Sequence, residues 1–143
     1  MLLQRVNRKE PEKIFIEVNN VEGATITTGY PVAYALGASM DGVQATIANA
    51  AGDYPQFMGV AYADIANNDY GLIQIAGYCN SILLSNAGTS ITVTAGDCLI
   101  PAPAGFYSAA APTYANAGFR HTVLRDTITV SAASYVRGLI RMI

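Results

Sequence analysis

Short strand-like runs separated by turn residues fill the stretch from Gly59 to Pro103. Gly71–Gly77 is rich in β-branched and long apolar residues, and Ser90–Thr94 alternates strictly between apolar and hydroxyl side chains. Ala95–Asp97 has the composition of a turn, and Cys98–Ile100 begins a further strand that prolines then end. This spacing of turn residues predicts β structure and is incompatible with a long helix.

The same pattern continues on both sides of this stretch. Asp41-Gly42 is a two-residue hairpin signal, although the alanines of Gln44–Ala51 also fit a helical turn. Further strands are expected at Ile14–Val18, Ala24–Thr28, Val32–Tyr34, Ala38–Met40, Val43–Ile47, Phe57–Tyr62, Arg120–Leu124, Thr127–Ser131 and Tyr135–Ile143. The sequence therefore predicts an all-β fold, a sandwich or barrel of about ten short strands.

The length of 143 residues suits one domain. Residues 1–13 are polar and charged and are interpreted as an extended N-terminal arm, followed by a single β domain over 14–143. Residues 101–118 have no clear periodicity and are predicted to form a long irregular loop.

Charge is distributed unevenly along the chain. No Lys or Arg occurs between Lys13 and Arg120, so residues 1–13 carry a net charge of +2, 14–119 of −7 and 120–143 of +3. Arginines alternate with apolar residues at the C-terminus, which suits an exposed or edge strand. The basic ends are expected to dock on an acidic partner surface. Nucleic acid is excluded as a partner because the acidic centre would repel phosphate.

Only 13% of the residues are charged, against about 25% in typical globular domains. A small domain with so few charges is expected to bury part of its surface against other copies of itself. Phe106, Tyr107 and Tyr114 are candidates for that contact, although they could equally cap the core of their own subunit.

The Gly-centred turns resemble those of the decoration, or cement, proteins of tailed-bacteriophage heads. The runs that carry this resemblance are Ala24–Val32, Asp41-Gly42, Gly59–Ala61, Tyr70–Gly77 and Thr94–Pro101. At one turn the Gly-Asp that is usual in the family is Gly29-Tyr30 here.

The resemblance implies a β-rich, non-enzymatic structural protein of the virion. Such a protein is made in the bacterial cytoplasm and binds the outside of the assembled head, commonly as a trimer, where it stabilises contacts between major capsid subunits. On this interpretation the expected partners are the major capsid protein and two further copies of the chain. The candidate capsid-binding residues are Arg5, Arg8, Lys9, Lys13, Arg137 and Arg141.

No enzymatic, cofactor or metal motif stands out. His121 with Asp126 and Ser131 or Ser134 contains the residue types of a triad without a nucleophile elbow, and Asp64 and Asp69 flank a turn, where acidic residues are common. Gly37–Gly42 has P-loop spacing, but Val43 replaces the lysine. We therefore expect no catalytic residues and no cofactor.

Two cysteines without a nearby histidine do not form a metal site, and Cys79 and Cys98 are expected to be buried thiols, although adjacent strands would allow a disulfide. An apolar run typical of a secretion signal does not follow Met1, and the long uncharged run Tyr70–Gly96 contains too many polar residues to span a membrane.

A carbohydrate- or receptor-binding β module, such as a head-fibre component, is the alternative function. Nine tyrosines could line a sugar or peptide site, although tryptophan, a common sugar-stacking residue, is absent.

Overall fold

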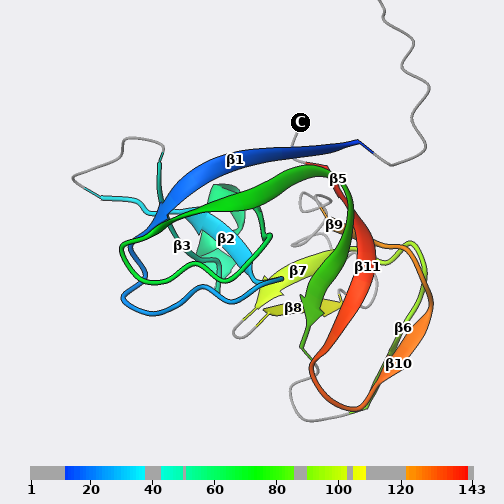
Figure 1. The fold of residues 1–143 in the computed structure, drawn as a ribbon. Helices are drawn as coiled ribbons and strands as arrows, with labels where there is room; N and C mark the ends of the chain where they lie inside the picture. Colours follow the sequence, from blue (N-terminus) through cyan, green and yellow to red (C-terminus); the bar gives the residue numbers. More distant parts are fainter. Residues whose placement is uncertain are drawn as a thin grey trace, which may run out of the picture.

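The computed structural model describes residues 12–37, 43–49, 51–85, 90–102, 105–108 and 122–141, excluding the side chains of residues 51, 52, 54, 107 and 108. The elements are β1 (Lys13–Asn20), β2 (Pro31–Tyr34), β3 (Gln44–Ile47), the 3-10 helix η1 (Ala51–Gln56), β4 (Phe57–Ala61), β5 (Tyr70–Leu84), β6 (Ile91–Val93), β7 (Leu99–Ala102), β8 (Gly105–Ser108), β9 (Thr122–Leu124), β10 (Ile128–Val130) and β11 (Ser134–Arg141). The all-β prediction is confirmed (Figure 1).

The first five strands close into a barrel. They are hydrogen-bonded in the order β1-β3-β2-β4-β5, and β5 pairs again with β1. The β1–β3 pair is parallel, and the other four pairs are antiparallel. The barrel interior, here called the inner core, consists of Val18, Ile26, Val32, Ala45, Met58, Ala61, Ile65 and Ile73. Closure removes the free strand edges that an open sheet of this size would expose.

Strand β5 connects the barrel to a second layer. Its first half pairs with β1 and β4, and its second half pairs with β11. Gly77 has φ of +95° at the junction, and the β1–β5 register shifts between Ile14 and Phe15. The buried Gln74 amide donates to the carbonyl oxygens of Ala76 at 3.1 Å and Tyr78 at 3.0 Å. These features bend β5 out of the barrel (Figure 1).

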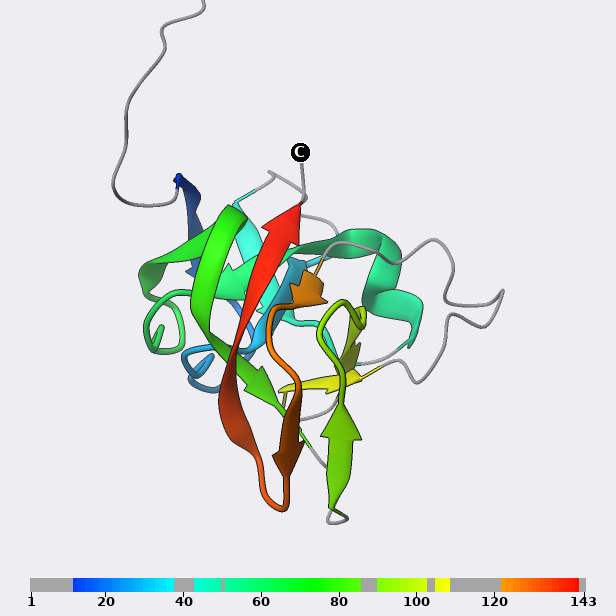
Figure 2. The ribbon, with the colours of Figure 1, turned by 90° about the vertical axis from the view of Figure 1, so that its right-hand side faces the viewer.

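The second layer covers a separate outer core. Strand β11 lies between β5 and β9 (Figure 2), and the β7–β8 hairpin joins the end of β5 through the pair Leu84 and Phe106. Phe106 packs edge-to-face on Phe57 of β4, with 6.0 Å between the ring centroids. The outer core consists of Ala33, Ala48, Phe57, Val60, Cys79, Ile82, Leu84, Val93, Leu99, Phe106, Leu124, Val130, Val136 and Ile140.

Strands β6 and β10 form a separate two-stranded sheet. Val93 and Val130 belong to the outer core, and Ile91 and Ile128 pack against it. On the exposed side, the hydroxyl oxygens of Thr92 and Thr129 are 2.8 Å apart. This confirms the alternation predicted for residues 90–94, with apolar side chains inward and hydroxyls outward.

Several predicted boundaries are wrong. Ala24–Thr28 is not a strand: Ile26 makes an isolated bridge with Ile65, because Gly23 and Gly29 on either side adopt positive φ. Strand β5 does not end at Gly77 but continues to Leu84. The predicted irregular loop contains part of the β7–β8 hairpin, and residues 109–118 lie outside the described residues.

Residues 38–42, with the predicted strand Ala38–Met40 and the Asp41-Gly42 turn, also lie outside the described residues. Strand β3 confirms the strand interpretation for most of Val43–Ile47, and η1 begins only at Ala51. The strand predicted from Ile14 begins one residue earlier, at Lys13.

Candidate docking faces

The candidate capsid-binding residues lie in two places. Lys13 is the first residue of β1, and Arg5, Arg8 and Lys9 lie outside the described residues. Arg137 and Arg141 are exposed on β11, where buried and exposed residues alternate as the sequence predicts. Of the two positions that this alternation suits, exposed or edge, β11 takes the exposed one, because it has β5 on one side and β9 on the other.

The outward side of β5, β11 and β9 forms a basic face, which we define as Tyr78, Arg125, Arg137, Leu139 and Arg141. The register places Leu139 between Tyr78 of β5 and Val123 of β9, and the Arg125 amide donates to the Arg137 carbonyl oxygen at 2.9 Å. These contacts bring side chains from three segments onto one surface.

Ion pairs and a ring contact order this basic face. Arg137 Nε donates to Asp126 Oδ2 at 2.8 Å, and Arg125 Nε lies 3.8 Å from Asp126 Oδ1. Arg125 also donates to the Tyr78 hydroxyl at 3.0 Å, and its guanidinium carbon is 5.5 Å from the centre of the Tyr78 ring. The hydrogen bond from Arg125 to the Tyr78 hydroxyl raises the pKa of Arg125 above its ordinary value. Three arginines and one aspartate leave this region with a net charge of +2.

A second face lies on the outside of the barrel. We define this acidic aromatic face as Phe15, Glu17, Tyr62, Tyr70 and Leu72. Glu17 is paired with Leu72 across β1 and β5, and the Tyr62 amide donates to the Leu72 carbonyl oxygen at 3.0 Å. Phe15 and Tyr62 stack edge-to-face with 5.0 Å between ring centroids.

The side chains of this acidic aromatic face are unusually open to solvent for their size. Tyr70 is 65% exposed, Tyr62 52% and Leu72 46%. Glu17 is also exposed, and the exposed Asp69 directly precedes Tyr70. Large exposed apolar side chains gathered on one surface are typical of contact sites. Sequence reasoning missed this face, although the alternation Tyr70-x-Leu72 opposite Phe15-x-Glu17 could have indicated it.

The aromatic residues predicted to contact other copies are placed differently. Phe106 is fully buried in the outer core, which matches the alternative that it caps the core of its own subunit. Tyr107 belongs to β8, but its side chain is not among those described, and Tyr114 lies outside the described residues.

The acidic residues considered for catalysis make structural contacts. Asp64 Oδ1 accepts hydrogen bonds from both the amide and the hydroxyl of Thr28, each at 2.7 Å. These bonds hold the pKa of Asp64 below its ordinary value, whereas a general acid needs a raised pKa. Asp126 is bound to Arg137, Ser134 Oγ donates to the Ala132 carbonyl oxygen, and His121 is not among the described residues.

Both cysteines are free thiols. Cys79 is buried as expected, and this burial raises its pKa, but Cys98 is only partly buried. Within the described ranges, no three His, Cys, Asp or Glu side chains are grouped as metal ligands would be. The same residues include no helix of the length and hydropathy that a membrane crossing requires.

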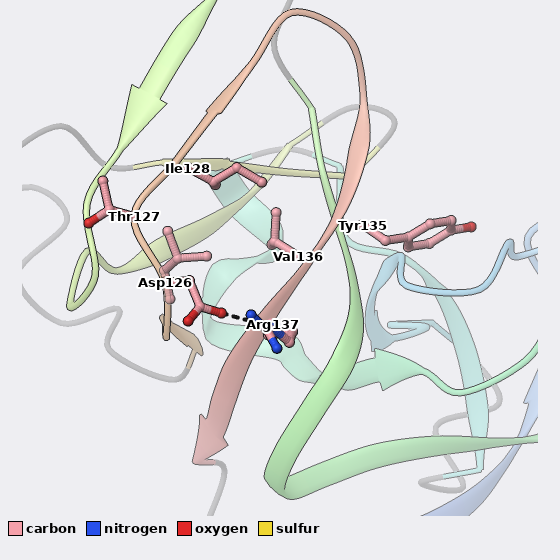
Figure 3. A pocket seen from close by; sticks show the side chains of 7 residues that line it. Asp126, Thr127, Ile128, Tyr135, Val136 and Arg137 are labelled. Atoms are coloured by element: carbon pink, nitrogen blue, oxygen red, sulfur yellow. Dashed lines mark hydrogen bonds and ion pairs between the residues drawn. The ribbon is translucent and has the colours of Figure 1, made fainter.

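A pocket of about 200 Å³ lies at the border of the basic face (Figure 3). Asp126, Ile128, Val136 and Arg137 contribute to its walls, and Figure 3 shows the Tyr135 side chain pointing away from the Asp126–Arg137 pair. Small-molecule sites usually measure about 300–1,000 Å³. The two exposed faces are therefore better candidates for function than this pocket.

Comparison with known proteins shows a similarity of fold and no similarity to a sequence family. No protein-family model matches the sequence, and no curated protein matches it. Among solved structures, the fold is similar to the head fiber gp8.5 N base in bacteriophage phi29, with a TM-score of 0.55 and 14% sequence identity. The similarity covers 92% of this chain and 96% of that one, so the two share their fold over nearly their whole lengths.

Proposed function

We propose that this chain is a non-enzymatic structural protein of a bacteriophage virion that binds the outer surface of the assembled head. The observation that carries the proposal is the fold shared with a phage head-fibre base over nearly the full length of both chains. The exposed, basic outer sheet supports it, because this surface suits docking on an acidic protein surface better than binding a small molecule.

In this proposal the protein is a trimer that clamps neighbouring major capsid subunits from outside, after synthesis in the bacterial cytoplasm. A protein that binds only the assembled lattice stabilises that lattice by mass action. Three linked copies bind far more tightly than one, so each single contact can be weak. The basic N-terminal segment with Arg5, Arg8 and Lys9, together with Arg137 and Arg141 of β11, supplies the positive charge for this contact.

The test measures how much protein binds purified heads that lack it, by co-sedimentation over a series of salt concentrations. We expect Arg5→Glu/Arg8→Glu to lower occupancy at low salt and to weaken its dependence on salt. Arg137→Gln/Arg141→Gln should also lower occupancy. A control with the same change in net charge as Arg137→Gln/Arg141→Gln is Thr92→Glu/Ser131→Glu, at exposed positions in β6 and directly after β10. Equal occupancy for all variants would contradict docking through the basic residues, and no binding by the unaltered protein would contradict the function.

A second candidate function is recognition of a carbohydrate or receptor by a head-fibre component. The observation that favours it is the exposure of Tyr62 and Tyr70 beside the Glu17 carboxylate, since aromatic faces and carboxylates together suit sugar rings and their hydroxyls. The unaltered protein would then bind specific sugars on a glycan array, and Tyr62→Ala/Tyr70→Ala would abolish this binding. Tyr107→Ala and Tyr114→Ala test the tyrosines chosen from sequence. An array without signal would count against this function.

A further inference from the structure

We infer that the acidic aromatic face of one copy packs on the basic face of a second copy of this chain. This inference rests on the oligomeric part of the proposed function and is independent of capsid binding. It identifies the two surfaces that meet, and it locates self-association at these two faces rather than at the aromatic residues of 106–114.

Charge complementarity between the two faces is the first argument. The acidic aromatic face contains Glu17 and lies next to Asp69, and both of these carboxylate residues are exposed. The basic face holds Arg125, Arg137 and Arg141, and Asp126 lies between the first two of these arginines. Faces of opposite sign attract and orient each other as the copies approach.

Apolar surface on both sides is the second argument. Leu72, Tyr62 and Tyr70 are between 46% and 65% exposed on one face, while Leu139 of the basic face is 39% exposed. These are four of the seven large hydrophobic side chains exposed among the described residues; the other three are Tyr34, Leu36 and Tyr135. Tyrosines and arginines around an apolar centre are the residues enriched in protein interfaces.

The sheet arrangement defines the kind of contact. Leu72 lies in the first half of β5, between β1 and β4, and Tyr78 lies in the second half, beside β11. The strands that carry both faces therefore have neighbours on each side, so a second copy meets them through side chains rather than by adding a strand. Because the two faces differ, the contact is heterologous, and such a contact forms a ring, for example a trimer, where the rotation between successive copies closes.

This contact also explains how two groups of arginines can affect capsid binding differently. In this arrangement Arg137 and Arg141, which the proposed function assigns to the capsid contact, lie between copies instead, so their loss lowers occupancy by removing the avidity of the oligomer. Arg5 and Arg8 act on the capsid, so their loss lowers occupancy while the oligomer persists.

The experiment is light scattering of the full chain over a concentration series, without capsids. The acidic-side variant is Glu17→Lys/Asp69→Lys, the basic-side variant is Arg137→Glu/Arg141→Glu, and a third protein combines all four changes. We expect the unaltered protein to associate and each two-residue variant to raise the dissociation constant about a hundredfold or more, because like charges then face each other. The combined variant should associate again, since its two faces are complementary with the signs exchanged.

Recovery in the combined variant cannot result from misfolding, and circular dichroism of the two-residue variants checks that each remains folded. Thr92→Glu/Ser131→Glu should leave the mass unchanged. The inference is overturned if both two-residue variants keep the mass of the unaltered protein, or if all folded variants, the combined one included, stay monomeric. An unaltered protein that is monomeric at every concentration overturns it as well, whereas head occupancy tests capsid binding separately.

Discussion

Gly77 is the residue on which the course of β5 depends. Its φ of +95° is in the region that L-residues avoid, and a Cβ at this position would collide with the Glu12 carbonyl oxygen. We expect Gly77→Ala to lower the free energy of unfolding by more than about 3 kcal/mol, because the conformational strain and the displacement of β1 add together. Urea denaturation followed by circular dichroism measures this change.

Gly96 provides the matched control for Gly77. It has the same φ of +95°, but a Cβ there would meet nothing within 4 Å. Gly96→Ala should therefore lower the free energy of unfolding only by the conformational strain of alanine at positive φ, about 1–2 kcal/mol. Equal losses for the two substitutions would show that close packing of β1 on β5 is not what requires glycine at position 77.

Asp64 should make the free energy of unfolding depend on pH in the acidic range. Hydrogen bonds from the amide and hydroxyl of Thr28 lower its pKa from the ordinary 3.8 in the folded protein. A carboxylate whose pKa is lower in the folded state stabilises the fold above the unfolded pKa and loses this effect as pH falls through the folded pKa. The stability advantage over Asp64→Asn should thus be present at pH 7 and decrease below about pH 4.

The measurement for Asp64 is the free energy of unfolding of both proteins from pH 7 to pH 2. Thr28→Val is the companion variant, because it removes the hydroxyl donor and keeps the backbone donor; it should reduce the dependence on pH without abolishing it. A constant difference between the unaltered protein and Asp64→Asn across this range would refute the role given to the carboxylate.

Among the elements, strands with strict alternation were predictable and strands with special backbone geometry were not. The residues of β6 and β11 show their inward and outward faces directly in the sequence, because each has one buried side. Strand β5 was not recognised at its full length, since Gly77 is typical of a turn in sequence but produces a bend within a continuous strand. The run Ala24–Thr28 has β-forming residues, but the glycines at its ends restrict pairing to one bridge.

The β6–β10 sheet is expected to open more easily than the barrel. It has three residue pairs in two strands, whereas Ile73 of β5 is paired on both sides within a closed barrel. Isolated two-stranded sheets are marginally stable, and local opening exposes amides to exchange. We expect the amides at 91–93 and 128–130 to exchange with deuterium at least about tenfold faster than those at 71–76. Similar protection would mean that this sheet opens only when the whole domain unfolds.

For the molecule as a whole, the charge distribution was predictable and the faces were not. The sequence shows directly that the centre of the chain lacks basic residues. Because these central residues form most of the barrel, the barrel is acidic, and the C-terminal arginines make the outer sheet basic. The faces depend on register, because Phe15 meets Tyr62, and Arg125 meets Tyr78, only after distant strands pair. Phe106 shows the reverse case: its local sequence resembles an exposed loop, while pairing of β8 with β5 and β7 buries it.

The two cores should unfold together, because β5 contributes Ile73 to the inner core and Cys79, Ile82 and Leu84 to the outer core. With Cys98→Ser, the buried Cys79 becomes the single thiol and reports opening of the outer core. Ile73→Ala should cost about 2–5 kcal/mol in the inner core. If the cores are cooperative, the rate at which a thiol reagent labels Cys79 should rise at least about tenfold, since every 1.4 kcal/mol is a factor of ten.

Phe106→Ala is the comparison for this labelling experiment, because it weakens the outer core directly and should cost about 3–5 kcal/mol. Plotted against the measured free energy of unfolding, the logarithms of the labelling rates of both variants should fall on one line. Labelling of Cys79 that responds to Phe106→Ala and not to Ile73→Ala would show that the outer layer opens while the barrel remains closed. In that case the bend at Gly77 would act as a boundary between two units that unfold separately.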